Sequence, residues 1–150
     1  MALWISFSWT SPSLLAGQKT VTRRDWNPQY AKRFKAGTIV TAYDKSPRNG
    51  GKPIARLRLT HDATYEADAD APDSDWAEEG FKWFQNRYGP RLKDGRDVSR
   101  HGFNGWRQGG NSSYVVRFEV IEYLSGPLAP KASRPQGEMA MAAQSEMEGV

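Results

Sequence analysis

The stretch LLAGQKTVTRRDW, residues 14–26, places a lysine, two threonines and two adjacent arginines directly after an apolar segment and a glycine. Ser11 and Pro12 come before it and are typical of a helix start, and Gly17 is typical of a helix end. The sequence therefore predicts a short helix that ends at Gly17 and a polar loop after it. Such a concentration of hydroxyl, amine and guanidinium groups indicates a binding or catalytic site.

Alternating apolar patterns and turn residues divide the rest of the chain into short elements. Strands are predicted over residues 3–9, 38–44, 52–62 and 113–124, and helices over residues 28–35 and 75–88, with one helical turn at 103–108. Short helices between strands, with a last strand after a long connection, are typical of an α+β fold. We expect four or five strands around one core, closed into a small mixed β-barrel with short flanking helices.

The length of 150 residues indicates one domain. We assign the domain to residues 1–124. Residues 125–150 are rich in proline, alanine and serine without useful periodicity, so we predict a disordered C-terminal tail.

The chain contains no cysteine, which excludes disulfides and thiolate metal sites and fits a reducing compartment. Its first ten residues are apolar but too short to span a membrane, and they lack the features of a signal peptide. We therefore expect a soluble cytoplasmic protein with no membrane partner.

The net charge of +4 conceals an uneven distribution along the chain. Eight of the 17 acidic residues lie within residues 62–79, whereas residues 1–61 and 80–124 together carry 19 basic and 6 acidic residues. Such a bias attracts polyanions, chiefly nucleic acid, although ordinary solubilising charge gives the same count.

Several side chains are suited to nucleic acid. The planar guanidinium groups of Arg23 and Arg24 match phosphate, and Arg56 and Arg58 alternate along the strand at 52–62, which predicts one basic face. Three aromatic residues are candidates for stacking on a base, unless they belong to the core: Trp9, Trp26 and Tyr43.

The quoted stretch also resembles the signature of ASCH domains, which are small barrels related to the RNA-binding PUA domains. The matching residues are Gly17, Lys19, Thr20, Thr22, Arg23 and Arg24. FKAGTIVTAYD, DWAEEGF and YVVRFEVIE add weaker similarity, and the match spans residues 3–124. The resemblance implies a PUA-like fold that binds RNA, DNA or a modified nucleoside, and this is our first functional hypothesis.

Some ASCH proteins are amidohydrolases that remove the acetyl group of N4-acetylcytidine, and the resemblance implies their catalytic residues at Lys19, Thr22 and Glu79. The last position rests on the short AEEGF match, where Glu78 is an alternative register. A threonine nucleophile needs a base, and lysine is a base only when burial or neighbouring cations lower its pKa. Lys19 and Thr22 are an odd number of residues apart, so a turn after Gly17 must bring them together.

The second hypothesis is therefore an amidohydrolase, and a third is a protein-interaction module with a regulatory tail. His61 and His101 are the only histidines and have no neighbouring ligand spacing, so neither a metal nor a cofactor is expected. The sequence leaves the oligomeric state open.

Overall fold

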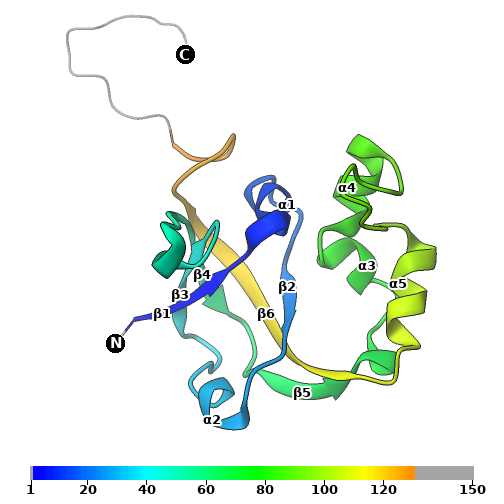
Figure 1. The fold of residues 1–150 in the computed structure, drawn as a ribbon. Helices are drawn as coiled ribbons and strands as arrows, with labels where there is room; N and C mark the ends of the chain where they lie inside the picture. The colour runs from blue at the N-terminus through cyan, green and yellow to red at the C-terminus, as the bar shows by residue number, and fades with distance from the viewer. Residues whose placement is uncertain (1, 131–150) are drawn as a thin grey trace, which may run out of the picture.

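The computed structural model describes residues 2–130, and six strands lie within this range (Figure 1). The strands are β1 (Leu3–Ser6), β2 (Val21–Arg24), β3 (Ile39–Tyr43), β4 (Pro53–Leu59), β5 (Thr64–Ala67) and β6 (Ser112–Tyr123). The α-helices are α1 (Ser11–Leu15), α2 (Pro28–Ala31), α3 (Asp75–Glu78), α4 (Phe81–Tyr88) and α5 (Arg100–Arg107). None of these helices combines the length and the apolar character that a membrane crossing requires.

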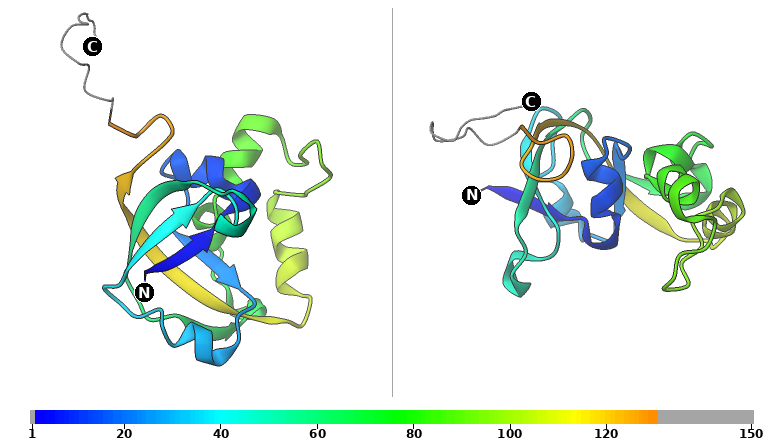
Figure 2. Two further views of the ribbon diagram at one scale, coloured as in Figure 1. Left: turned by 60° about the vertical axis from the view of Figure 1, so that its left-hand side comes forward. Right: turned by 90° about the horizontal axis from the view of Figure 1, so that it is seen from above.

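The strands form one curled sheet in the order β1-β3-β4-β6-β2, with β5 also paired to β6. The β1–β3 pair is parallel and the others are antiparallel. The long β6 joins the sheet, since its first half pairs with β2 and β5 and its second half with β4. The predicted α+β class with a small mixed sheet is confirmed, and the sheet has the shape of a half-barrel (Figure 2).

The main core lies inside the curl of the sheet and includes Phe7, Leu14, Phe34, Leu57 and Phe118. Apolar residues at every second position of β4 contribute to it, as the alternation predicts, but Ile54 and Ala55 are both buried. The pairing of β3 with β4 shifts between Ala42 and Tyr43, where Ile54 is the extra residue of β4, and this irregularity turns Ile54 inward. Strict alternation would place Ile54 on the face of Arg56 and Arg58, and its burial departs from that pattern.

The predicted helix over residues 75–88 is broken into α3 and α4. The break lies at Gly80, whose φ of +93° belongs to the left-handed region that side chains with a Cβ rarely adopt. A Cβ at this position would lie 2.3 Å from the Ser13 hydroxyl of α1, so glycine also permits close packing of the two segments. Helices α3, α4 and α5 lie together beside the sheet (Figure 1).

Other boundaries differ less. Asn27 caps the helix predicted from residue 28, because its side chain accepts a hydrogen bond from the backbone N–H of Tyr30. The helix that Asn27 begins is shorter than predicted, α5 is longer, and β5 was not predicted at all. β5 lies at the start of the acidic stretch 62–79 and pairs with β6, a long-range contact that no local pattern indicates.

The first residues of the predicted tail lie against the domain. A Cβ on Gly17 would lie 3.2 Å from Leu128, and one on Gly126 would lie 3.0 Å from the Leu15 side chain. Residues 125–130 therefore pack beside α1, and the remainder of the predicted tail, 131–150, lies outside the described residues.

Candidate functional site

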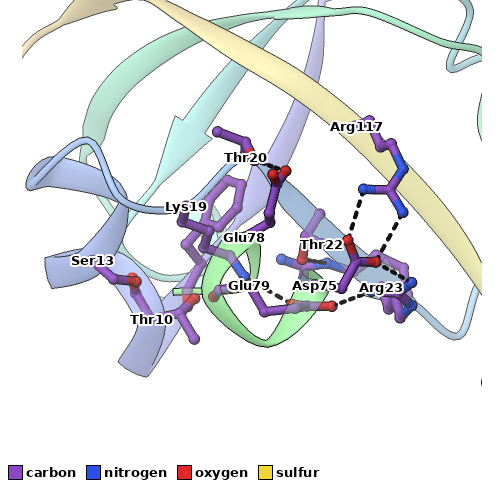
Figure 3. A network of polar contacts seen from close by, with 12 residues as sticks. Thr10, Ser13, Lys19, Thr20, Thr22, Arg23, Asp75, Glu78, Glu79 and Arg117 are labelled. Atoms are coloured by element: carbon purple, nitrogen blue, oxygen red, sulfur yellow. Dashed lines mark hydrogen bonds and ion pairs between the residues drawn. The ribbon is translucent and has the colours of Figure 1, made fainter. Parts of the chain in front are cut away.

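Lys19 is buried between α1 and the α3–α4 junction, with only 2% of its surface exposed. The chain turns at Gly17, and the backbone N–H of Thr20 donates to the Glu78 carbonyl. This turn directs the Lys19 ammonium toward Glu79, where Nζ donates to the carbonyl oxygen at 2.9 Å and to Oε1 at 3.1 Å (Figure 3). The sequence-predicted lysine and glutamate are thus in direct contact.

Glu79 joins Lys19 to Arg23. Its Oε2 accepts a hydrogen bond from Arg23 Nη1 at 2.8 Å, while Oε1 is bound by Lys19. Because the helix predicted over 75–88 breaks at Gly80, Glu79 is the C-cap of α3 and not an interior residue of one long helix. Glu78, the other glutamate that the short AEEGF match allows, lies at the surface instead, where it accepts a hydrogen bond from the Thr20 hydroxyl.

Asp75 continues the set of ion pairs. Arg23 Nη2 donates to Asp75 Oδ2 at 2.5 Å, and Arg117 of β6 donates to both Asp75 oxygens at 3.0 and 2.8 Å. Burial alone would raise the pKa of Asp75, but the hydrogen bonds and charges of Arg117 and Arg23 outweigh it and lower the pKa. We call this chain of contacts the inner ion network: Lys19, Glu79, Arg23, Asp75 and Arg117.

Thr22 and Arg24 lie on the opposite face of β2 from Arg23, as alternation along a strand requires. Arg24 Nε donates to the Thr22 hydroxyl at 3.1 Å, and its guanidinium lies 5.4 Å from the centre of the Phe7 ring. The Lys19 ammonium lies 6.0 Å from the same ring. Lys19 and Arg24 therefore converge on Phe7, and Thr22 is joined to them through its hydrogen bond with Arg24.

Burial affects the protonation of both cations near Phe7. Desolvation lowers the pKa of Lys19 despite the opposing charge and hydrogen bond of Glu79. Desolvation also lowers the pKa of Arg24, although guanidinium groups stay charged in proteins. A lowered pKa brings Lys19 closer to the neutral amine that a general base requires.

A cleft of about 370 Å³ opens beside the inner ion network. Its lining residues are Trp9, Arg23, Glu79, Phe81, Arg96, Asp97, Gly102, Phe103 and Trp106. Glu79 and Arg23 thus have contact with the cleft, whereas Lys19 and Thr22 are not among its lining residues. Within residues 2–130, no group of three or more histidine, cysteine, aspartate or glutamate residues is placed to hold a metal ion.

Aromatic rings form much of the cleft wall. Trp9 and Phe81 stack with their rings 6.0 Å apart and 5° from parallel, and Phe103 and Trp106 stack at 5.5 Å. The Arg23 guanidinium lies 5.5 Å from the Trp106 ring, which connects the aromatic wall to the network. Of these rings, only Trp9 was among the predicted stacking residues. The spacing of three between Phe103 and Trp106 was the available signal, since it places them on one helix face.

The other predicted contact residues lie elsewhere. Arg56 and Arg58 are exposed on β4 and pair across the strands with β6 glutamates, so the predicted basic face is charge-balanced. The pairs are Arg56–Glu122 at 3.0 Å and Arg58–Glu119 at 3.5 Å. Trp26 stacks on Phe34 at 4.2 Å against the core, and Tyr43 contacts Trp4 edge to face. The structure gives each of these four residues a partner outside the cleft.

Comparison with known proteins gives a similarity of structure but not of sequence family. No protein-family model matches the chain, and no curated protein matches it. The crystal structure of protein EF3133 from Enterococcus faecalis, described as a DUF984 family member, has a TM-score of 0.48 and 16% sequence identity, and the alignment covers 80% of this chain and 79% of that one. This similarity concerns the fold at most.

Proposed function

We propose that this protein binds a nucleobase of RNA, or of a modified nucleoside, in the cleft beside the inner ion network. The observation that carries the proposal is the combination of stacked aromatic rings with a carboxylate and guanidinium groups in one cleft. A volume of about 370 Å³ lies within the range of about 300–1,000 Å³ found for small-molecule sites.

The polar groups of the cleft suit the edge of a base. Glu79 provides carboxylate oxygens that accept from an amino or ring N–H, and the second hydrogen on each terminal nitrogen of Arg23 provides a donor for a carbonyl or ring nitrogen. Lys19 and Asp75 hold these two side chains by direct hydrogen bonds, so little side-chain freedom is lost when a ligand binds. The resemblance of residues 17–24 to the ASCH signature supports the same class of ligand.

The test is to measure the binding of short RNA oligonucleotides at low salt by tryptophan fluorescence or calorimetry. Trp106→Ala should weaken binding about 5- to 150-fold, which corresponds to the loss of about 1–3 kcal/mol of base stacking. Trp4→Ala is the matched control, because Trp4 and Trp106 are both 37% exposed and Trp4 lies on β1 outside the cleft. Equal affinities of both variants and the wild-type protein would contradict the proposal.

A second candidate is an amidohydrolase acting on N4-acetylcytidine-type nucleosides. The observation in its favour is a buried amine with a lowered pKa, Lys19, which is joined to Glu79 and lies near the same ring as Arg24, the hydrogen-bond partner of Thr22. In this reaction the Thr22 hydroxyl attacks the acetyl carbonyl and gives its proton to Lys19. The C–N bond breaks as the cytidine amine receives a proton, and water then hydrolyses the acyl-threonine to acetate.

The amidohydrolase is tested by incubating the protein with N4-acetylcytidine and measuring cytidine and acetate. Turnover that is lost in Thr22→Ala and Lys19→Met, and retained in Thr20→Ala, would support the enzyme. Thr20 is a suitable control because its hydroxyl donates to Glu78 at the surface and not to a residue of the cleft. Binding of the nucleoside without turnover would leave the binding function alone.

A further inference from the structure

Trp9 is held in the cleft by an unusual backbone. The residue before it, Ser8, has a φ of +50°, and it is the only residue other than glycine with a positive φ in the part of the chain that the structure describes. This conformation is costly for a side chain with a Cβ, and such outliers gather at functional sites. The turn at Ser8–Thr10 places the Trp9 ring parallel to Phe81 and 5.4 Å from Phe84.

Arg96 covers part of the Trp9 ring. Its guanidinium carbon lies 4.7 Å from the ring centre, within the range of a cation–π contact. A guanidinium in this position occupies space that a planar base would use to stack on Trp9. Arg96 belongs to the segment between α4 and α5, and its side chain is 46% exposed.

Arg96 differs from the two arginines of the ASCH-like stretch. Both terminal nitrogens of Arg23 already donate to carboxylates, at Glu79 and Asp75. Arg24 is directed to Thr22 and Phe7 and does not line the cleft. Arg96 pairs only through Nη1 with exposed Asp94 among residues 2–130, which leaves Nε and Nη2 as donors.

We propose that Arg96 is the phosphate contact of this cleft and that Trp9 is a second stacking ring beside Trp106, so that the ligand is a nucleotide rather than a bare nucleoside. The inference rests on the proposed binding function and specifies its ligand. A guanidinium group matches the oxygens of a phosphate better than an ammonium does, and charge-assisted bonds of this kind are about twice as strong as neutral ones.

Two acidic side chains near Arg96 oppose an incoming phosphate. Asp94 is 48% exposed, and an ion pair in that environment is weak, so a phosphate with up to two negative charges displaces it at low cost. Asp97 lines the cleft, but its Oδ1 accepts from both the backbone N–H and the hydroxyl of Ser99, and its Oδ2 lies 3.8 Å from Arg91. The charge of Asp97 is thus already partly compensated.

The experiment compares the four ribonucleosides with their 5′-monophosphates by fluorescence titration at low salt, with inorganic phosphate as an additional probe. In the wild-type protein at least one monophosphate should bind about tenfold or more tighter than its nucleoside, the ratio expected for one hydrogen bond to a charged group. Arg96→Gln should reduce that ratio to about one, with nucleoside affinity unchanged or higher because the Trp9 ring is uncovered. Trp9→Ala should weaken nucleoside and nucleotide together.

Arg87→Gln is the matched control, since the Arg87 guanidinium also lies over a tryptophan, 5.6 Å from the Trp83 ring, but does not line the cleft. It should leave the ratio unchanged. A trinucleotide that depends on Arg96 and binds more tightly than any monophosphate would identify the source of the phosphate as an RNA strand, and the reverse order would identify a free nucleotide.

The failures are distinguishable. If the wild-type protein binds no nucleoside, nucleotide or RNA, the proposed function itself is wrong. If it binds nucleosides and monophosphates equally, or if Arg96→Gln leaves a clear preference for the monophosphate intact, only the role of Arg96 is overturned.

Discussion

The inner ion network and the outer face of β4 use the same chemistry in opposite environments. In the network, Lys19 is 2% exposed and Asp75 is 1% exposed. Lys19 contacts Glu79, Glu79 contacts Arg23, and Asp75 contacts both Arg23 and Arg117. On the outer face, Arg56 and Glu122 form an isolated pair in which each side chain is 51% exposed. Both regions contain arginines that are equally conspicuous in the sequence.

Burial, and not the presence of arginine, therefore decides whether a charged side chain is held in place and how much it contributes to stability. A buried ion pair is expensive to desolvate, and removing one partner leaves a charge without compensation. An exposed pair gains little, because water and salt screen it. The network can therefore hold Glu79 and Arg23 in fixed positions at the cleft, whereas the outer pairs mainly balance surface charge.

The largest expected effect follows from removing the acid that two arginines share. Asp75→Asn leaves Arg23 and Arg117 without their common carboxylate and should lower the free energy of unfolding by about 3–5 kcal/mol. Urea unfolding followed by circular dichroism measures the change. Glu122→Gln on the outer face is the control and should cost about 1 kcal/mol or less. Similar small losses in both variants would show that the network is not stabilising in the way its burial indicates.

Local pattern was sufficient to predict much of the fold. The Ser-Pro start and Gly17 end of α1, the Asn27 cap and the long β6 all depend on signals within a few residues. The resemblance of two short motifs to ASCH domains indicated that Lys19 and Glu79 belong to one site, and the structure has them in contact. In both cases the relevant signal is carried by neighbouring residues in the chain.

Features that depend on distant partners could not be predicted in this way. Asp75 is the first residue of the predicted helix over 75–88, and nothing near it in the sequence indicates the approach of Arg23 and Arg117. The β4 arginines looked like a basic face, because the register that sets Glu119 and Glu122 opposite them depends on strand pairing. The cleft depends on how α5 packs, and Arg96 reaches it from the segment between α4 and α5, which has no periodicity.

The next largest effect on stability is expected at Gly80, where the helix breaks directly after Glu79 of the network. Gly80→Ala places a Cβ in a left-handed conformation and 2.3 Å from the Ser13 hydroxyl. We expect a loss of about 1–2 kcal/mol from the conformation, and about 1–3 kcal/mol more from the overlap. Denaturant unfolding measures both terms together.

Gly37→Ala separates the two contributions. Gly37 has a similar φ of +86°, but an added Cβ would have no atom within 4 Å. This variant should show the conformational loss alone, so the difference between the two alanine variants measures the packing of α1 against the α3–α4 junction. Equal losses would mean that Ser13 moves aside freely.

A smaller effect should appear in the pH dependence of stability. The pKa of Asp75 is lower in the folded protein than the value of about 3.9 of an unfolded chain, so its ionised form stabilises the fold. That contribution is complete above about pH 4 and is lost as the pH falls through the lowered pKa of the folded state. The stability difference between wild-type protein and Asp75→Asn should therefore shrink on acidification, as measured by urea unfolding at several pH values. A difference that stays constant down to acid unfolding would contradict this sign.

The smallest effects are expected on the outer face, where the sequence predicted nucleic-acid contacts at Arg56 and Arg58. Each arginine already has a glutamate partner on β6, so a double-mutant cycle of Arg56→Gln and Glu122→Gln should give a coupling of only about 0.2–1 kcal/mol. If these arginines also bound phosphate, each substitution would reduce the slope of log affinity against log salt by about one. We expect an unchanged slope for RNA binding, because a phosphate here would first meet the negative charges of Glu119 and Glu122. A reduced slope would extend the binding surface from the cleft across the sheet, and the contrast between the two regions would then concern stability alone.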